Sequence, residues 1–210
     1  MTVLRIDASI QGPNSASSEL ADVAEAEWLS VRPGTEFIRR HLGSEPLPAD
    51  AWQNAIGGAF TPEDQRNEHQ QAGVALAQQL NNEVRNAEAV ILALPLYNWG
   101  VSQHAKIWID LVLAGGPNGE RLLDGKPAIV VTTRGGGYSP GTPREGWDHN
   151  TSFIRRIVED VWGADLTLVE RELTLAHVSP AMESLRDAAD LLKKAAHEAA
   201  AHAGRTHAAR

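Results

Sequence analysis

The sequence predicts an α/β protein in which helices cover both faces of one five-stranded parallel sheet. Five short runs rich in Val, Ile and Leu alternate with longer segments of helical periodicity, a pattern typical of parallel sheets. The runs at residues 89–95 and 128–133 carry apolar residues at consecutive positions, as strands buried on both faces must. The 210 residues are enough to bury a core without metals or disulfides.

Residues 3–8 form the first expected strand, because Val and Ile favour strands and polar, turn-forming residues follow. Ser15 or Ser17 is then expected to cap a helix. Apolar residues recur along that helix every three or four positions, at Leu20, Val23, Ala24 and Trp28.

Residues 36–42 are expected to form a second, more exposed strand after Pro33-Gly34 breaks the first helix. The Gly- and Pro-rich segment 43–62 is interpreted as a surface excursion. Thr61 resembles a helix cap with Pro62 at the first helical position, so this helix is expected from there to about Val84.

The remaining strands are predicted at residues 89–95, 128–133 and 166–171. Helices are predicted at residues 102–113, 152–162 and 179–201, the last of them rich in Ala. Residues 1–203 are expected to form a single domain, with residues 204–210 as a frayed tail.

The amino-acid composition excludes several classes of function. The net charge of −8 argues against nucleic-acid binding, which needs a basic surface to neutralise phosphates. Without cysteine the chain has no thiol redox chemistry, so any redox reaction requires a bound cofactor. No secretion signal and no membrane-spanning apolar run is found, which favours a cytoplasmic protein with no membrane partner.

Three loops follow strands at the sheet edge where such proteins bind ligands. Residues 9–17 open a helix, and the hydroxyls of Ser9, Ser15 and Ser17 with free backbone N–H groups are suited to a phosphate monoester. The loop lacks the Walker and GxGxxG patterns. The alternative is that its serines only cap the helix and form turns.

The second loop, Pro95-Leu96-Tyr97-Asn98-Trp99, offers two flat aromatic faces to a planar heterocycle, with Asn98 for the polar edge of that ring. Alternatively, both aromatics belong to the core. The third loop, residues 133–138, contains three glycines whose backbone N–H groups are suited to stabilising negative charge on a bound ring. A flexible surface loop is the alternative.

The P-L-Y-N-W element at 95–99 and the T-R-G-G element at 133–136 resemble the flavodoxin-like FMN-dependent NADH:quinone oxidoreductases, or azoreductases. The resemblance covers nearly the whole chain, including residues 106–110 and 124–126. It implies a flavodoxin-like sheet of order 2-1-3-4-5, bound FMN, and NADH or NADPH as co-substrate. It also implies a homodimer whose active sites are completed by the partner subunit.

By this resemblance the first loop holds the FMN phosphate, the second lies against the isoalloxazine, and the third meets its pyrimidine edge. The residues expected to bind FMN are Ser9, Ser15, Ala16, Ser17, Pro95, Leu96, Tyr97, Asn98, Trp99, Thr133, Arg134, Gly135 and Gly136. NAD(P)H would reduce FMN and leave before a small-molecule acceptor, a quinone or azo compound, takes the electrons. No side chain is assigned as an essential acid or base, and no metal site is expected; Tyr138 is the candidate substrate contact, with Arg144 and His149 as weaker candidates.

The sequence departs from the family pattern mainly on the acceptor side. Tyr138 replaces a frequent histidine, segment 114–123 is shorter and segment 139–149 is enlarged, while Ala16 replaces a polar residue in the phosphate loop. Two alternatives therefore stay open. One is a specialised flavin-dependent reductase of a biosynthetic pathway with a reshaped acceptor pocket, and the other is a flavodoxin-type electron carrier.

Overall fold

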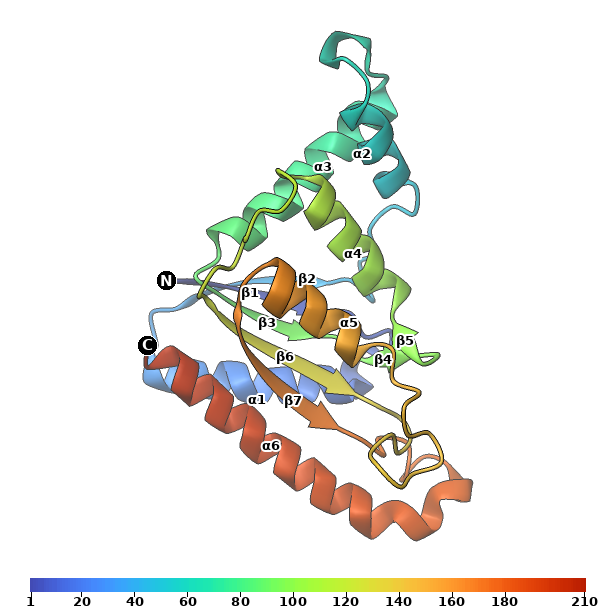
Figure 1. Cartoon of the computed structure of the whole chain (residues 1–210). Helices are drawn as coiled ribbons and strands as arrows, with labels where there is room; N and C mark the ends of the chain where they lie inside the picture. Colours follow the sequence, from blue (N-terminus) through green and yellow to red (C-terminus); the bar gives the residue numbers. More distant parts are fainter.

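A computed structural model describes all 210 residues and contains the predicted sheet (Figure 1). Its five parallel strands lie in the order β2-β1-β3-β6-β7. The strands are β1 Thr2–Asp7, β2 Glu36–His41, β3 Ala89–Ala93, β6 Pro127–Thr133 and β7 Asp165–Arg171. This order confirms the expected 2-1-3-4-5 arrangement of a flavodoxin-like fold.

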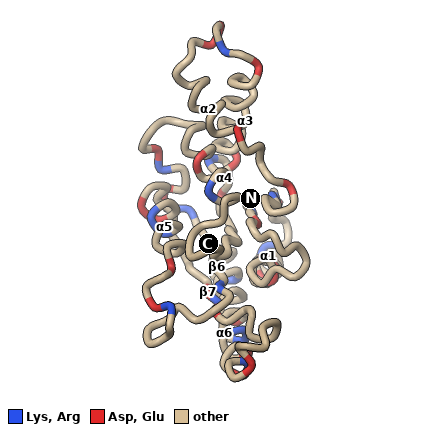
Figure 2. Tube along the Cα trace, turned by 90° about the vertical axis from the view of Figure 1, so that its right-hand side faces the viewer, with Lys and Arg blue, Asp and Glu red and all other residues tan.

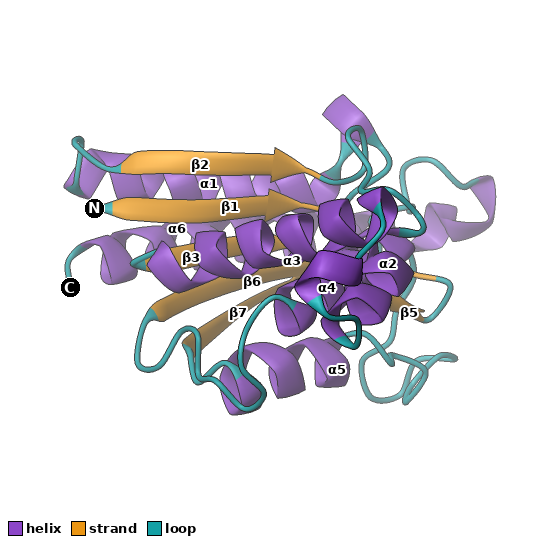
Figure 3. Cartoon of the chain, turned by 90° about the horizontal axis from the view of Figure 1, so that it is seen from above, coloured by secondary structure: helices purple, strands orange, loops and turns teal.

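Helices cover both faces of the sheet, as Figures 1 and 3 show. One face carries α1 (Ala16–Val31) and α6 (Arg186–Ala208), and the other carries α3 (Glu68–Asn86), α4 (Gln103–Ala114) and α5 (Thr151–Arg155). The packing of strand β3 explains why its residues are all apolar. Val90 and Leu92 belong to the core under α3 and α4, whereas Ile91 belongs to the core under α1 and α6.

Segment 43–62 contains a helix, which its Gly- and Pro-rich composition did not predict. Helix α2, Ala51–Ala59, packs against α3 and projects beyond the sheet (Figure 1). Its glycine permits close packing: a Cβ on Gly58 would lie 2.6 Å from Val74 Cγ2. Glycine therefore marks a helix contact here, not a loop.

Helix α3 begins at Glu68 and not at Pro62. Asn67 accepts a hydrogen bond from Gln70 N at 2.9 Å, and Asn67 N donates to Gln70 Oε1 at 3.1 Å. This reciprocal capping box outcompetes the Thr61-Pro62 start, which leads only into the 3₁₀ turn Glu63–Gln65.

The chain end is ordered, so the expectation of a frayed tail at 204–210 is wrong. Helix α6 continues to Ala208 after the 3₁₀ turn Pro180–Leu185, and Gly204 and His207 are buried. A Cβ on Gly204 would collide with the carbonyl oxygen of Ala24, so the end of α6 lies directly on α1. The predicted helix 152–162 also differs, since α5 widens into a π-helix at Arg156–Val161.

Acidic and basic residues are interspersed on the outer helices (Figure 2). No helix combines the length and apolar character needed to cross a membrane.

Candidate functional site

A cavity of about 690 Å³ lies beyond the carboxyl ends of β1, β3 and β6. Cofactor sites commonly measure about 300–1,000 Å³. The cavity brings together the three loops singled out in the sequence. Of the predicted residues, it is lined by Ser9, Ser15, Ala16, Ser17, Pro95, Leu96, Tyr97, Asn98, Trp99, Thr133, Gly135, Gly136 and Tyr138.

The first loop presents neutral donors to the cavity. Ser15 caps α1 by accepting a hydrogen bond from Ser18 N at 3.1 Å, and its Oγ lies 3.1 Å from Ser17 Oγ. Both serines are buried, and the backbone N–H groups of Ala16 and Ser17 have no acceptor within the protein. The start of a helix with free N–H groups and hydroxyls is suited to holding a phosphate.

Tyr97 joins the second loop to the first. Its hydroxyl lies 3.1 Å from Ser9 Oγ and accepts a hydrogen bond from Ile10 N at 3.2 Å. Ser9 Oγ in turn accepts a hydrogen bond from Gln11 N at 3.2 Å. Tyr97 therefore acts partly through its hydroxyl, by fixing the loop that carries the serines.

The second loop is a tight hairpin. Strands β4 (Leu96–Tyr97) and β5 (Gly100–Val101) pair antiparallel, and the two turn residues Asn98 and Trp99 both have positive φ, 47° and 65°. Such a turn suits Asn but strains Trp, by about 1–2 kcal/mol. The strained Trp99 is half exposed and meets Trp147 edge to face, with ring centroids 6.1 Å apart. Strain at a cavity wall points to a functional role for this tryptophan.

The third loop presents backbone donors. The N–H groups of Gly135, Gly136 and Gly137 have no acceptor within the protein, although the carbonyls of Gly135 and Gly136 accept hydrogen bonds from Leu175 N and Leu173 N. Of these three glycines, Gly135 and Gly136 line the same cavity as Thr133. The loop thus holds its backbone in place while leaving its N–H groups for a ligand.

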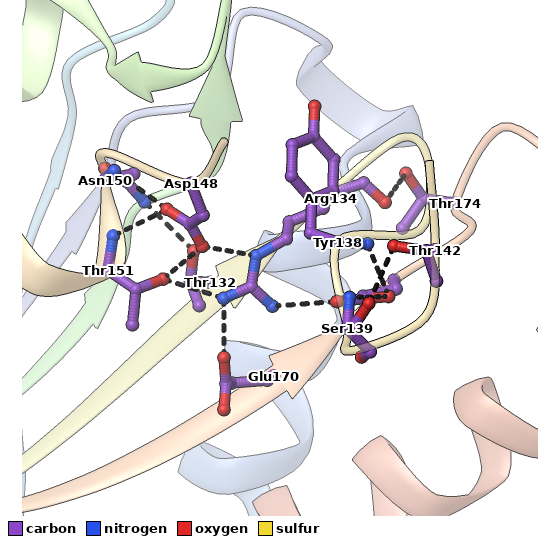
Figure 4. A network of polar contacts seen from close by, with 11 residues as sticks. Thr132, Arg134, Tyr138, Ser139, Thr142, Asp148, Asn150, Thr151, Glu170 and Thr174 are labelled. Atoms are coloured by element: carbon purple, nitrogen blue, oxygen red, sulfur yellow. Dashed lines mark hydrogen bonds and ion pairs between the residues drawn. The ribbon is translucent and has the colours of Figure 1, made fainter. Parts of the chain in front are cut away.

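Arg134 does not line the cavity, contrary to the expectation from sequence. Its buried side chain turns into a cluster of carboxylates, shown in Figure 4. Nε donates to Asp148 Oδ2 at 2.6 Å and Nη2 donates to Glu170 Oε1 at 2.6 Å, while Nη1 lies 3.7 Å from Glu172 Oε1. We call Arg134, Asp148, Glu170 and Glu172 the arginine cluster.

The arginine cluster holds both ends of loop 135–149. Glu172 accepts hydrogen bonds from Tyr138 N at 2.9 Å and Ser139 N at 3.3 Å, and Asp148 accepts one from Thr151 N at 2.9 Å. Burial opposes the charge on Asp148, but the hydrogen bonds from Thr151 and the charge of Arg134 outweigh it and lower the pKa of the Asp148 carboxyl. The Asp148 carboxylate is therefore ionised at neutral pH and pairs with Arg134.

Other residues that line the cavity were not predicted from the sequence, or were only weaker candidates for substrate contact. Thr174, Leu175 and Val178 come from the segment that follows β7, where Leu173 has a φ of 58°. The rule that ligands bind at carboxyl strand ends applies to this fifth strand too and would have found them. Arg144 lines the cavity, while the His149 side chain does not; His149 N donates to the carbonyl of Trp99 at 2.9 Å.

Buried charges support the first loop from below. Arg5 and Asp7 lie on β1, and Arg5 Nε donates to Asp7 Oδ2 at 2.8 Å while Nη1 donates to Glu25 Oε2 at 2.9 Å. They line a second cavity, of about 520 Å³, that shares Ser9 and Ser15 with the first. The alternation of Arg5 and Asp7 in an otherwise apolar strand was the sequence signal for this cluster.

Comparisons with known proteins agree with this fold. The family model of the flavodoxin-like fold matches residues 1–203. An FMN-dependent NADH:quinone oxidoreductase of Frankia alni is 36% identical over 88% of this chain and 90% of its own length. One of Parafrankia sp. is 30% identical over 94% of this chain and 96% of its own.

Solved structures share the fold at lower identity. An azoreductase from Bacillus anthracis superimposes with a TM-score of 0.76 at 22% identity, covering 98% of this chain and 99% of its own. A second azoreductase of that species, FMN-dependent and in complex with FMN, gives 0.68 at 17% identity, covering 95% of this chain and all of its own. The chain therefore belongs to the flavodoxin-like family that includes the FMN-dependent NADH:quinone oxidoreductases.

Proposed function

We propose that this protein binds one FMN in the cavity and catalyses the two-electron reduction of quinones or azo compounds by NADH or NADPH. The observation that carries the proposal is the donor set of the cavity. Neutral donors at the helix start and free glycine N–H groups lie at two of its walls, with an aromatic hairpin as a third. Its relatives of known name carry out this class of reaction.

Each wall suits one part of FMN. The hydroxyls of Ser15 and Ser17, with the N–H groups of Ala16 and Ser17, are suited to the phosphate. Residues 95–99 would lie along the isoalloxazine, and the N–H groups of Gly135 and Gly136 would meet its pyrimidine edge.

The protein contributes binding, orientation and electrostatics to the reaction. When bound, FMN would supply the two-electron hydride chemistry that links NADH or NADPH to the acceptor. The fixed N–H groups of Gly135 and Gly136 favour negative charge at the ring edge. Trp99, Leu175 and Val178 provide apolar surface at the cavity wall, and Tyr138 would contact the acceptor. Solvent or the Tyr138 hydroxyl supplies the proton that completes the reduction.

The visible spectrum of the purified protein tests this proposal. We expect oxidised-flavin absorbance that disappears when NADH or NADPH is added without oxygen and returns when a quinone follows. Continuous turnover with quinone distinguishes an enzyme from an electron carrier, which would show almost none. A colourless protein that does not take up added FMN would overturn the proposal.

One observation supports the alternative of a specialised reductase. Loop 139–149, which the sequence suggested to be enlarged, places Arg144 in the cavity wall, as a reshaped acceptor pocket would require. A panel of quinones, azo dyes and other acceptors tests it. Fastest turnover with simple neutral quinones would contradict it.

We also propose that the protein is a cytoplasmic homodimer. NADH and NADPH are supplied in the cytoplasm, and apolar side chains stand exposed where a second subunit would cover them. Trp52 and Phe60 lie on the projecting α2 segment, 47% and 87% exposed, and Val178 at the cavity mouth is 76% exposed. Light scattering should give twice the chain mass; a monomer at micromolar concentration would contradict this.

A further inference from the structure

Arg144 is the only charged residue among the 19 that line the cavity. It also makes no ion pair, because no carboxylate lies within 4.0 Å of its guanidinium. The nearest acid along the chain, Glu145, accepts a hydrogen bond from Gly141 N at 2.8 Å instead. In a chain of net charge −8, the cavity thus carries one unpaired positive charge.

The Arg144 side chain lies against the third loop. Its guanidinium carbon lies 5.9 Å from the centroid of the Tyr138 ring, within the range of a cation–π contact. The far end of the Arg144 side chain also lies against the backbone of Gly136, where a Cβ would overlap Nη1. Turns within the loop hold its backbone: Glu145 N donates to Thr142 O and Trp147 N donates to Arg144 O, both at 3.1 Å.

The ligand that this charge attracts is not the FMN phosphate. The phosphate donors belong to residues 15–17, whereas Arg144 contacts Gly136 and Tyr138 of the third loop. Arg144 is solvent-exposed, so it meets the part of the cavity through which molecules enter and leave. Its guanidinium lies against the third loop, which would face the flavin ring. A charged group attached directly to an aromatic acceptor stacked on the flavin would therefore lie within reach of Arg144. In NADH a ribose separates the diphosphate from the reacting nicotinamide ring, so the diphosphate lies further away than such a substituent.

We propose that Arg144 selects electron acceptors whose aromatic ring carries an anionic group, such as a sulfonate or carboxylate. This inference rests on the proposed reductase function and names its acceptor class. The overall exchange balances as NADH, a proton and a quinone giving NAD⁺ and the hydroquinone, and the anionic group takes no part in it. Tyr138 and Trp99 would hold the ring while Arg144 pairs with the charge.

Steady-state kinetics with a matched pair of acceptors tests the proposal. 1,4-Naphthoquinone and its 2-sulfonate share a ring and differ in charge, and the FMN-loaded wild-type protein is compared with Arg144→Gln and Arg144→Lys. The control is Arg156→Gln, which makes the same charge change on the π-helix, where Arg156 pairs only with exposed Asp160. Flavin content is measured for every variant.

We expect Arg144→Gln to raise the KM for the sulfonate about tenfold, because a charge-assisted contact is lost. KM values for neutral naphthoquinone and NADH, and the flavin content, stay unchanged. Arg144→Lys recovers part of the loss and Arg156→Gln shows none. Added salt should raise the sulfonate KM of the wild type but not that of Arg144→Gln.

Three results would overturn the inference while leaving the reductase function intact. They are equal changes for both quinones, a rise in the KM for NADH alone, and loss of flavin from Arg144→Gln. Wild-type protein that binds FMN but reduces neither quinone would instead overturn the proposed function and this inference with it.

Discussion

Replacing Asp148 by alanine tests whether the arginine cluster secures loop 135–149. Asp148 Oδ1 accepts hydrogen bonds from Asn150 N at 2.8 Å and Thr151 N at 2.9 Å, and loss of such a helix-start acceptor costs about 1 kcal/mol. Oδ2 accepts from Arg134 Nε at 2.6 Å, a charged hydrogen bond whose loss costs about 2 kcal/mol. Arg134 keeps Glu170 and Glu172, which limits the penalty of its buried charge.

The expected loss for Asp148→Ala is therefore about 3 kcal/mol of unfolding free energy. For a chain of this length that lowers Tm by about 6–12 °C. Urea denaturation of the FMN-free protein, followed by circular dichroism, measures the change without a contribution from ligand binding. Asp148→Asn keeps an acceptor for the two backbone N–H groups and should lose about half as much.

Asp124→Ala is the matched control, since exposed Asp124 pairs only with exposed Arg121 and its removal should cost less than about 0.5 kcal/mol. The reasoning is refuted if Asp148→Ala destabilises the protein no more than this control does. The lowered pKa of Asp148 adds a pH signature. Its contribution is present above the ordinary carboxyl pKa of 3.8 and is lost as the pH falls through the lower folded value, a step that Asp148→Asn should lack.

Three further substitutions probe other contacts. Tyr97→Phe removes the hydroxyl that fixes Ser9 and Ile10, so FMN affinity measured by fluorescence titration should weaken about fivefold. Unchanged affinity would show that the first loop is held without the Tyr97 hydroxyl. Gly204→Ala should destabilise the protein by about 1–3 kcal/mol, because the new methyl group overlaps the Ala24 carbonyl. Helix propensity alone predicts a gain in stability instead, and such a gain would mean that α6 does not lie so close to α1. Burial first, and the charge of Arg210 second, lower the pKa of His207, so below the ordinary value of 6.5 the unfolded chain takes up a proton that the folded chain does not, and stability falls. Urea midpoints at pH 7.5 and 5.5 should therefore differ less in His207→Asn than in the wild type, and an equal difference would exclude His207 as the cause.

Much of the fold was predictable because each strand of this sheet is a short apolar run between recognisable turns. The uncertain parts were those where a residue type has two structural uses. Gly58 looks like a loop former but allows α2 to approach α3, and Gly204 looks like a helix end but allows α6 to lie on α1. Composition along one segment does not reveal the helix that packs against it, so both errors had a tertiary cause.

The candidate site was predictable at the level of loops, because strand order fixes which loops meet. The direction of individual side chains was not. Arg134 follows β6 among cavity residues, yet carboxylates from β7 and from loop 139–149 draw its side chain away. Arg144 lies ten positions later in an irregular loop, and only its turns return it to the cavity wall.

The absence of cations from the first loop governs how the empty protein would acquire its cofactor. Hydrogen bonds from serines and backbone N–H groups act only at contact, so they do not attract a dianion from a distance. At longer range FMN meets a chain of net charge −8, which repels it, because the one cation in the cavity wall, Arg144, lies at the third loop and away from the phosphate donors. Added salt screens that repulsion but barely weakens the short hydrogen bonds. Reconstitution of the empty protein with FMN should therefore become faster as ionic strength rises, opposite to the trend in proteins that capture phosphates with lysine and arginine.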